Sequence, residues 1–275
     1  MTRTEKGLEN KLLKLTEVTD ELDSVLVAFS GGVDSTFLLK VAFDVLGYEN
    51  VVAATATSST ITPEDQDRAV RLASEIGARH VLIPSNELRN PIYCANSPDR
   101  CYHCKKIRFS DLKRFQAEQG IRYIVEGSNL DDLSDYRPGI KATEETGVRS
   151  PLREAGLYKQ EIRELSRELG LSNWNLPSQA CLASRFPYGT TITEERLKQV
   201  SSSEKLLRNL GFAQVRIRYH GDVARIEVPS EDLLRVVQHR VAIVDYIKNT
   251  GFAYVTVDLS GFRSGSMNNV LRGKA

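Results

Sequence analysis

Two of the four cysteines in this 275-residue chain are separated by two intervening residues, in the stretch CYHCKK that runs from Cys101 to Lys106. That spacing is typical of metal sites, redox disulfides and iron–sulfur clusters. Cys94 lies seven residues before the pair, and Cys181 lies far along the chain. The spacing alone is therefore compatible with several chemistries.

Four interpretations of these cysteines compete. Zn²⁺ favours four nitrogen or sulfur ligands, and the candidates for a structural zinc site are Cys94, Cys101, Cys104, Cys181 and His103. A thiol–disulfide pair would lack the thioredoxin-like surroundings that usually accompany it. A [4Fe–4S] cluster on three cysteines would leave one iron open. Cys181 could also be a catalytic thiol unrelated to the pair.

A second stretch whose residues could take part in chemistry is SGGVDS, from Ser30 to Ser35, between a predicted strand and a predicted helix. Glycines let backbone N–H groups approach an anion closely, and the following helix N-terminus adds a favourable dipole. Asp34 would repel a phosphate unless a cation lay between them, and a shared Mg²⁺ removes that conflict. The stretch therefore predicts a phosphate site with a bound divalent cation.

This glycine loop matches neither the Walker A pattern nor G-x-G-x-x-G. It resembles the PP-loop of ATP pyrophosphatases, enzymes that adenylate a substrate oxygen and release pyrophosphate. The resemblance implies ATP and Mg²⁺ as cofactors. The ATP contacts that we expect are Ala28, Phe29, Ser30, Gly31, Gly32, Asp34, Ser35, Thr55 and Gly127.

A further polar loop, EGSNLDDLSDYRPG, follows a later predicted strand. Ligands of α/β sheets bind at the carboxyl ends of the strands. Asp132 and Arg137 are therefore candidates to reach the metal or a phosphate, with Asp34 and Asp132 as the expected Mg²⁺ ligands. A plain solvated loop remains the alternative for either residue.

The elements that must position these residues alternate regularly. Apolar runs predict strands near residues 24–29, 51–57, 80–85 and 123–126, and helical spacing predicts helices over 34–46, 63–76 and 105–119. Thr62 is the expected N-cap of the second helix, with Pro63 at its first position and Gly77 beyond its end. The alternation predicts an α/β fold whose parallel sheet is covered on both faces, in a domain over residues 1–170.

The pattern changes near Gly170. A long irregular stretch containing Cys181 is followed by a predicted helix, a hairpin around Gly221, another helix over residues 230–251 and a strand near 254–262. This order predicts a smaller α+β domain over residues 171–275.

Basic residues surround the cysteines. Lys105, Lys106 and Arg108 follow the pair, and Arg185 follows Cys181. Positive charge stabilises thiolates and attracts anionic substrates. A closed zinc site gains little from such neighbours, whereas an open cluster beside an adenylated substrate gains more. From the residues alone, zinc and cluster remain equally compatible with the pattern, and ordinary reduced cysteines remain a third alternative.

The overall composition bounds the class of protein. Hydrophobic residues make up 41% and charged residues 27%, and 37 basic against 36 acidic residues leave a formal net charge of +1. That balance argues against broad nucleic-acid binding. No apolar run approaches the roughly 18 residues of a membrane span, and the charged N-terminus has no signal-peptide core. We expect a cytoplasmic protein without a membrane segment.

Six stretches together resemble the LarE family: AFSGGVDST, DYRPGIKA, LSNWNLPSQACLASRFPYGTTIT, VRIRYH, ARIE and DLSGFRSGSMN. The resemblance covers almost the whole chain, and ACLASRFPYGT and GFRSGSMN are its most specific parts. It implies an ATP-dependent sulfur transferase of nickel-pincer nucleotide biosynthesis, in which the domain over residues 171–275 would serve substrate binding, sulfur transfer and oligomerisation. Such an enzyme adenylates the carboxylates of pyridinium-3,5-biscarboxylic acid mononucleotide and converts them to thiocarboxylates.

The family resemblance also implies residue roles. One class of LarE proteins sacrifices its own cysteine, and another holds a [4Fe–4S] cluster on three cysteines. Cys101, Cys104 and Cys181 place this chain in the cluster class, with Cys94 outside the pattern. Lys105 would steady the adenylate. The expected phosphate ligands of the mononucleotide are Ser184, Arg185, Arg216 and Arg218, and Glu204 and Glu227 would bind a metal at a subunit contact.

Other functions stay open from the sequence. Cys181 could give up its own sulfur in a single turnover, or the chain could be a PP-loop tRNA thiolase. An ammonia-dependent ligase similar to NAD synthetase and a zinc-stapled nucleotide sensor are further alternatives. We expect a sulfide donor and further copies of the chain as partners, and no nucleic acid.

Overall fold

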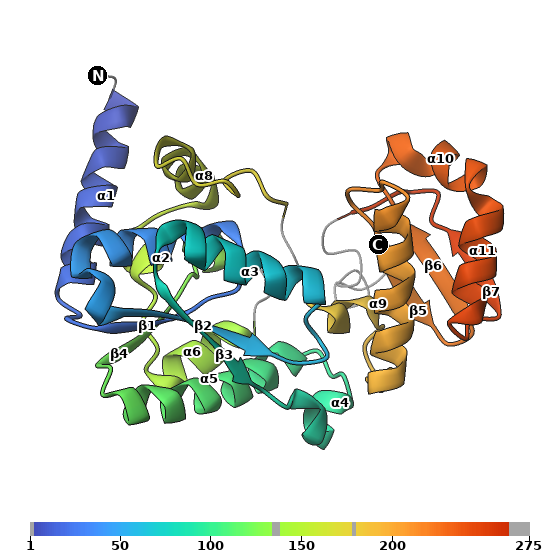
Figure 1. Ribbon diagram of the computed structural model, residues 1–275, viewed down its shortest axis with the longest axis horizontal. Coiled ribbons are helices and arrows are strands. Elements are labelled where there is room, and N and C mark those ends of the chain that lie inside the picture. Colours follow the sequence, from blue (N-terminus) through green and yellow to red (C-terminus); the bar gives the residue numbers. More distant parts are fainter. Residues whose placement is uncertain (1–2, 134–137, 178–179, 264–275) are drawn as a thin grey trace. The chain divides into compact units, whose positions relative to one another are not determined.

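The computed structural model describes residues 3–133, 138–177 and 180–263 (Figure 1). The chain forms two compact units: Met1–Glu87 with Asp99–Gln179, and Leu88–Pro98 with Ala180–Ala275. The short segment Leu88–Pro98 thus belongs to the second unit although it precedes CYHCKK in the sequence. The predicted division into domains over residues 1–170 and 171–275 stays a prediction.

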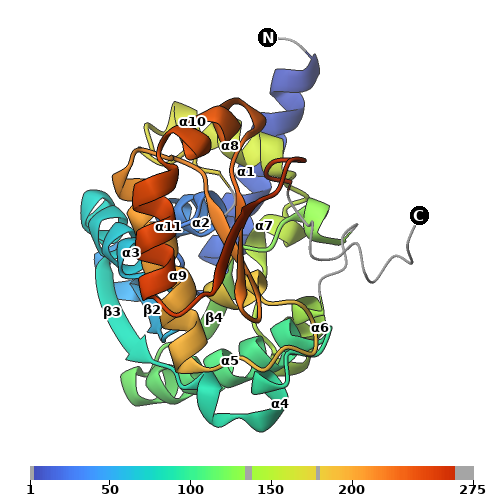
Figure 2. The ribbon, with the colours of Figure 1, turned by 90° about the vertical axis from the view of Figure 1, so that its right-hand side faces the viewer.

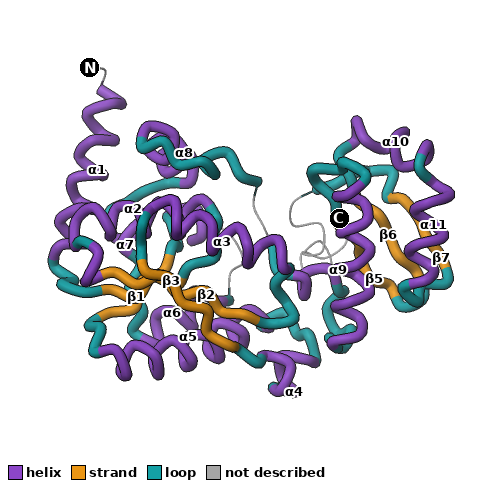
Figure 3. Tube along the Cα trace, in the orientation of Figure 1, coloured by secondary structure: helices purple, strands orange, loops and turns teal. Residues whose placement is uncertain are grey.

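The described part of the first unit contains a sheet of four parallel strands, β1 (Val25–Ala28), β2 (Val51–Thr57), β3 (Arg79–Pro84) and β4 (Tyr123–Glu126) (Figure 3). Their order is β3-β2-β1-β4, so β1 pairs with both β2 and β4. The strand order therefore reverses at β1. In open α/β sheets the carboxyl end of such a strand is the usual place for a ligand.

Both faces of this sheet are buried. Val25 and Val27 of β1 join one apolar cluster, whereas Leu26 between them joins another with Phe109 and Leu112. The first face is covered by α1 (Arg3–Asp20), α2 (Val33–Leu46), α3 (Pro63–Ile76), α7 (Pro151–Glu154) and α8 (Lys159–Glu168). The second is covered by α5 (Arg100–Gln119), against which α6 (Gly139–Thr146) packs. The predicted α/β fold with a two-sided parallel sheet is confirmed.

Local signals placed the ends of α3 correctly. The Thr62 hydroxyl accepts a hydrogen bond from the Asp65 backbone N–H, Pro63 is the first helical residue, and Gly77 ends the helix in a left-handed conformation. The predicted start of α5 at Lys105 is wrong, because the helix begins at Arg100. Its first turn is polar and shows no apolar period. The cysteine pair therefore lies on a helix and not in a loop before one.

In its described residues, the second unit contains a three-stranded sheet of β5 (Arg216–His220), β6 (Val223–Glu227) and β7 (Tyr254–Val257) (Figure 2). β5 and β6 form the predicted hairpin, and β7 runs parallel to β6. The helices of this unit are α4 (Pro91–Cys94), α9 (Glu194–Asn209), α10 (Leu233–Gln238) and α11 (Arg240–Asn249). The single predicted helix over 230–251 is wrong, because His239 leaves helical geometry and separates α10 from α11.

Short 3₁₀ turns complete the described elements, at Tyr48–Asn50, Glu87–Arg89, Leu130–Leu133, Leu182–Arg185 and Ser230–Asp232. Among the helices of the described ranges, none is both long enough and apolar enough to cross a membrane.

Candidate functional site

The glycine loop leads from the carboxyl end of β1 into the N-terminus of α2. Gly31 has a φ of +68°, and a Cβ atom there would lie 3.0 Å from the Cα of Ala69 in α3. Glycine is therefore required both by the backbone conformation and by the close approach. The hydroxyls of Ser30 and Ser35 are 3.1 Å apart, and Ser35 Oγ donates to the Gly32 carbonyl at 3.2 Å. These contacts hold the loop around the first turn of the helix.

The strand ends beneath the loop are tied to each other. The Phe29 backbone N–H, which follows Ala28, donates to the Ala54 carbonyl at 2.8 Å. Thr55 Oγ1 donates to the Phe29 carbonyl at 2.8 Å and also lies 2.8 Å from His80 Nε2. Thr55 therefore supports the predicted ATP loop from the neighbouring strand. His80, which the sequence did not indicate as a site residue, contacts the same hydroxyl.

Gly127 connects β4 to the same place. A Cβ atom at this position would lie 3.0 Å from the backbone nitrogen of Ser35. The absence of a side chain thus lets the end of β4 pack directly against the N-terminus of α2. The structure brings the two loops that the sequence predicted as ligand-binding to one edge of the sheet.

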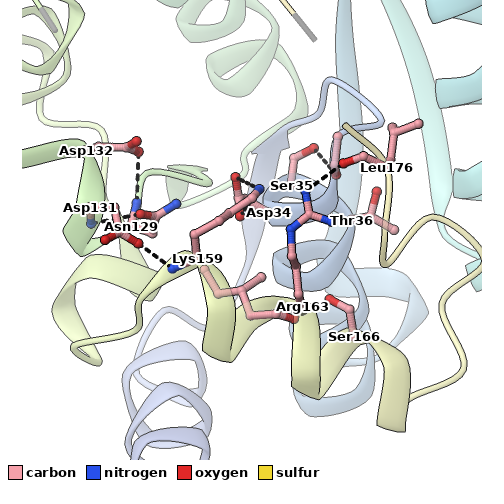
Figure 4. A network of polar contacts seen from close by, with 12 residues as sticks. Asp34, Ser35, Thr36, Asn129, Asp131, Asp132, Lys159, Arg163, Ser166 and Leu176 are labelled. Atoms are coloured by element: carbon pink, nitrogen blue, oxygen red, sulfur yellow. Dashed lines mark hydrogen bonds and ion pairs between the residues drawn. The ribbon is translucent and has the colours of Figure 1, made fainter. Parts of the chain in front are cut away.

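Asp34 forms an ion pair that the sequence did not predict (Figure 4). Lys159 Nζ lies 2.7 and 2.6 Å from the two carboxylate oxygens of Asp34. Lys159 is the first residue of α8, and its backbone N–H donates to the Asp131 carboxylate at 2.6 Å. Burial raises the pKa of the Asp34 carboxyl, and the opposing charge of Lys159 offsets this only in part.

Asp132 is the second predicted Mg²⁺ ligand. It is buried and accepts a hydrogen bond from the Asn129 backbone N–H at 3.1 Å. Its negative charge contributes to the raised pKa of Asp34, so the two carboxylates lie within electrostatic reach of each other. Mg²⁺ prefers oxygen ligands and usually combines one or two carboxylates with phosphates and water. Asp34 and Asp132 fit that requirement.

In the described ranges, no three His, Cys, Asp or Glu side chains converge as a metal-binding group. A two-carboxylate site of the kind described for Mg²⁺ does not need a third protein ligand, because substrate phosphates complete the coordination.

The segment of residues 173–176 contacts both the glycine loop and helix α8. The buried Asn173 side chain donates to the Gly31 carbonyl at 3.3 Å and to Thr36 Oγ1 at 2.9 Å. Arg163 of α8 donates to the Trp174 carbonyl at 2.9 Å and to the Leu176 carbonyl at 2.8 Å. Helix α8 thereby positions both Lys159 and this segment. The apolar spacing of Ile162 and Leu165 in YKQEIRELSRELG was the sequence signal that could have predicted helix α8.

The predicted catalytic lysine, Lys105, is anchored at the same edge of the sheet. Its ammonium lies 3.1 Å from Glu126 Oε2 and 3.1 Å from Thr143 Oγ1. Glu126 is the last residue of β4, directly before Gly127, and accepts from Ser150 Oγ at 2.8 Å. Burial alone would raise the pKa of Glu126, but the Lys105 charge and neighbouring hydroxyls lower it overall.

Cys101 and Cys104 occupy the first two turns of α5, three residues apart and hence on one face of the helix. Cys101 is exposed and Cys104 is half-buried. Cys104 Sγ lies 3.8 Å from Glu87 Oε1, and that oxygen also accepts from Arg108 Nε at 2.5 Å. Glu87 is fully buried and was missed by the sequence analysis, because its partners lie 17 and 21 residues further along the chain.

Cys181 belongs to the second unit and is half-buried. It stands directly before the 3₁₀ turn Leu182–Arg185. The Arg185 guanidinium is buried and forms a bidentate pair with Glu204, with Nε–Oε1 at 2.8 Å and Nη2–Oε2 at 3.0 Å. The neighbouring Ser184 is half-buried. The structure thus brings predicted phosphate ligands and a predicted metal ligand into one buried cluster.

The remaining members of this cluster lie on β5 and β6. The strand register pairs Arg216 with Glu227 and Arg218 with Arg225, so all four residues share one face of the hairpin. Arg218 Nη2 lies 2.7 Å and Arg225 Nη2 lies 3.1 Å from the Glu227 carboxylate. Burial and the neighbouring guanidinium of Arg185 lower the pKa of Arg216 to about 10. An added anion would relieve this crowding of positive charge.

Cys94 lies at the end of α4 in the second unit. Its thiol donates to the Leu88 carbonyl at 3.2 Å, and its carbonyl accepts from the Ile192 backbone N–H at 2.9 Å. Burial raises the pKa of the Cys94 thiol, which disfavours the nucleophilic thiolate. These contacts fit the expectation that Cys94 stands outside the three-cysteine pattern.

The predicted site residues therefore fall into two groups. The predicted ATP and Mg²⁺ residues, Lys105, Cys101 and Cys104 belong to the first unit. The second unit holds Cys181, Ser184, Arg185, Arg216, Arg218, Glu204 and Glu227. Residues 135–137, which include Arg137, and residues 264–268 of GFRSGSMN lie outside the described residues.

Comparison with known proteins bears on both groups. The chain is 44% identical, over 264 residues, to the pyridinium-3,5-bisthiocarboxylic acid mononucleotide synthase of Lactiplantibacillus plantarum, and the match covers 96% of each chain. The chain belongs to the LarE family. An uncharacterised protein of Synechocystis is 48% identical over 266 residues, which is 96% of this chain and 99% of that protein.

Outside the LarE family the similarity is partial. The family model described as NAD synthase matches residues 4–100. An NH₃-dependent NAD⁺ synthetase of Chlorobaculum tepidum is 27% identical over 153 residues, covering 54% of this chain and 53% of that protein. LarE proteins thus share a PP-loop region with these ligases, as expected from the glycine loop, whereas the L. plantarum match extends over nearly the full chain.

Proposed function

We propose that this chain is an ATP-dependent sulfur transferase acting on pyridinium-3,5-biscarboxylic acid mononucleotide. It adenylates the substrate carboxylates and converts them to thiocarboxylates, which gives the pyridinium-3,5-bisthiocarboxylic acid mononucleotide. The name of the L. plantarum relative supports this assignment. The PP-loop supports the ATP-dependent first step.

One structural observation carries the proposal. Lys105, on the helix of the cysteine pair, contacts Glu126, and the next residue, Gly127, packs against the N-terminus of α2. A cysteine-bearing helix is thus fastened to the nucleotide-binding edge of the sheet. An enzyme that uses ammonia has no need of such cysteines, whereas sulfur transfer to an adenylated substrate does.

In the first step, a carboxylate oxygen of the substrate attacks the α-phosphorus of ATP. The new phosphorus–oxygen bond forms as the bond to pyrophosphate breaks, and pyrophosphate leaves. Backbone N–H groups of residues 30–35 and the dipole of α2 would bind the phosphates. Asp34 and Asp132 would hold Mg²⁺, which neutralises phosphate charge when bound.

In the second step, a sulfur nucleophile attacks the acyl carbon. A carbon–sulfur bond forms, the carbon–oxygen bond to the phosphate breaks, and AMP leaves. Lys105 would stabilise negative charge on the adenylate, because its ammonium is oriented by Glu126 and Thr143. Two rounds convert both carboxylates.

Cys101, Cys104 and Cys181 would hold a [4Fe–4S] cluster. All three thiols are at least partly exposed, and iron–sulfur clusters take thiolate ligands, so the donor set fits. Three cysteine ligands leave one iron open, where the cluster would supply an exchangeable sulfide when bound. The alternative source of sulfur is Cys181 itself, in a single turnover.

Ser184, Arg216 and Arg218 would bind the phosphate of the mononucleotide. The charged cluster around them combines buried and half-buried side chains. It contains the five arginines 185, 208, 216, 218 and 225 and the three carboxylates of Glu204, Glu227 and Asp258. The excess of two positive charges matches a phosphate monoester dianion, and arginine suits its geometry. A metal at Glu204 or Glu227, as the family resemblance implies, would compete with these arginines.

The NAD synthase match favours one second candidate, an ammonia-dependent ligase. Two parallel assays separate the two functions. Anaerobically purified protein receives ATP, Mg²⁺ and the dicarboxylate mononucleotide, with sulfide in one assay and ammonium in the other. We expect thiocarboxylate with sulfide and no amide with ammonium, measured by mass spectrometry. Amide formation with ammonium, and none of the thiocarboxylate with sulfide, would overturn the proposal in favour of the ligase. The proposal also includes a sulfide donor, a homo-oligomer and a cytoplasmic location.

A further inference from the structure

The Arg185 side chain folds back onto the backbone of its own turn. Its Nη1 donates to the Ala180 carbonyl at 2.6 Å and to the Cys181 carbonyl at 3.1 Å, and it lies 3.0 Å from Ser184 Oγ. The Cys181 carbonyl also accepts from the Ser184 backbone N–H at 2.9 Å. The backbone on both sides of the Cys181 side chain is thereby held by one guanidinium.

The other edge of the guanidinium is fixed by Glu204. Both side chains are almost fully buried, at 2% and 0% exposure. Glu204 is held in turn by Arg208 Nη2 at 2.7 Å and by the Ile217 backbone N–H at 3.0 Å. Contacts from helix α9 and from strand β5 therefore determine where the guanidinium of Arg185 lies.

A second pair holds the other end of the turn. Arg218 Nη1 donates to the Ser184 carbonyl at 3.0 Å. The rest of its guanidinium binds Glu227 Oε2, with Nε at 2.9 Å and Nη2 at 2.7 Å. Two buried arginine–glutamate pairs, one at each end, thus brace the segment that carries Cys181.

Arg185 has little capacity left for a substrate. A guanidinium has five N–H donors. Nε and Nη2 face the Glu204 carboxylate, and the two hydrogens of Nη1 already serve three acceptors. Buried ion pairs contribute little net stability compared with apolar packing, so this pair is better explained by positioning than by stability.

We propose that Arg185 and Glu204 are positioning residues for Cys181, and that Arg185 is not a ligand of the mononucleotide phosphate. The pair fixes the backbone of residues 180–184 and so gives the Cys181 thiol one direction. This inference rests on the proposed function only in taking Cys181 as a participant in sulfur transfer.

The variant Arg185→Lys tests the brace without a loaded cluster. Lysine can still pair with Glu204 but cannot also donate to two carbonyls of the turn. In reduced, metal-free protein, we expect alkylation of Cys181 by iodoacetamide to accelerate about tenfold, as the loss of charge-assisted hydrogen bonds implies. Hydrogen exchange of the peptide covering residues 181–186 should accelerate with it.

Two matched controls accompany this measurement. Alkylation of Cys101, in the other unit, should not change in the same sample. Arg208→Lys, which alters a partner of Glu204 on helix α9 and leaves Arg185 itself in place, should leave the Cys181 rate within about twofold. Unchanged alkylation and unchanged exchange in Arg185→Lys would overturn the inference. If that variant does not fold, Glu204→Gln releases the same guanidinium while preserving side-chain shape.

Kinetics provide a second, independent readout. A positioning role predicts that Arg185→Lys lowers kcat and leaves the KM for the mononucleotide unchanged, whereas Arg216→Lys raises that KM. A raised KM with unchanged kcat in Arg185→Lys would restore the phosphate-ligand role and overturn the inference. Failure of the native protein to transfer sulfur at all would remove the proposed function, while the alkylation and exchange results would still test the brace.

Discussion

The ammonium of Lys159 lies 2.6 and 2.7 Å from the two carboxylate oxygens of Asp34. Asp34 is in the first turn of α2, the helix that follows the glycine loop, and Lys159 is the first residue of α8. A protein cation thus already neutralises the carboxylate that is expected to bind Mg²⁺. Burial raises the pKa of Asp34, and the charge of Asp132 raises it further, so the carboxylates need such a counter-charge. A Mg²⁺ held by Asp34 would supply the same kind of counter-charge as Lys159.

Lys159→Met removes this counter-charge and keeps the length of the side chain. We expect the metal-free protein to lose about 1–3 kcal/mol of unfolding free energy, because Asp34 and Asp132 remain close without the ammonium that contacts Asp34. Mg²⁺ should restore more stability to this variant than it adds to the native protein. Thermal unfolding with and without Mg²⁺ measures both effects.

Lys40→Met is the matched control, because Lys40 pairs with Asp44 on the exposed side of α2, the helix that carries Asp34. Its effect should stay below about 1 kcal/mol and should not depend on Mg²⁺. Equal stabilisation of native protein and Lys159→Met by Mg²⁺ would contradict the assignment of Asp34 to the metal.

Gly31→Ala tests the close approach of the glycine loop to α3. The new methyl group would lie 3.0 Å from a backbone atom of Ala69, in addition to the strain of a positive φ. We expect a loss of about 2–4 kcal/mol in urea unfolding and of ATP binding in calorimetry. Gly120→Ala has a similar φ and open space around it, so it should show only the conformational part, about 1 kcal/mol, and normal ATP binding. Equal effects of the two variants would contradict the packing argument.

Glu126→Gln tests the contact that fastens the cysteine helix to β4. Despite burial, the charge of Lys105 and the hydroxyls of Ser128 and Ser150 hold the pKa of Glu126 below its ordinary value of 4.5. A carboxyl with a lowered folded-state pKa stabilises the fold above its unfolded-state pKa, and that contribution disappears as pH falls through the folded-state pKa.

The native protein should therefore be more stable than Glu126→Gln at neutral pH, by a constant amount above about pH 5.5. The difference should shrink as the pH falls below 4.5. Urea unfolding across this range measures it. A difference that stayed constant down to about pH 3 would show that the charge of Glu126 contributes nothing.

The three-cysteine set makes a prediction for metal content. After anaerobic reconstitution with iron and sulfide, Cys101→Ser, Cys104→Ser and Cys181→Ser should each lose most of the bound iron and the visible absorbance. Cys94→Ser should keep both, because its thiol donates to the Leu88 carbonyl. Zinc without iron in the native protein, or loss of iron in Cys94→Ser, would exclude the proposed ligand set.

Local features of the fold were visible in the sequence. The Thr62–Pro63 start and Gly77 end of α3 depend only on neighbouring residues. The order of apolar strands and helices likewise indicated the parallel sheet, and the glycine loop indicated its ligand edge. The polar first turn of α5 gave no such signal, which is why the helical position of the cysteines was missed.

Contacts between distant residues were not predictable. Lys159 lies 125 positions from Asp34, and nothing in the sequence near either residue specifies the other. The same holds for Arg185, whose partner Glu204 lies on a separate helix 19 residues away. A family pattern identified Arg185 as functional, but only its burial and its hydrogen bonds to the Cys181 turn point to a positioning role.

The most direct test of the central claim follows the carboxylate oxygen. The dicarboxylate mononucleotide is labelled with ¹⁸O in its carboxylates and incubated anaerobically with the protein, ATP, Mg²⁺ and sulfide. Adenylation followed by sulfur attack predicts one ¹⁸O atom in each AMP released and one AMP for each thiocarboxylate formed, measured by mass spectrometry. AMP without the label, or thiocarboxylate formed without AMP, would contradict the account.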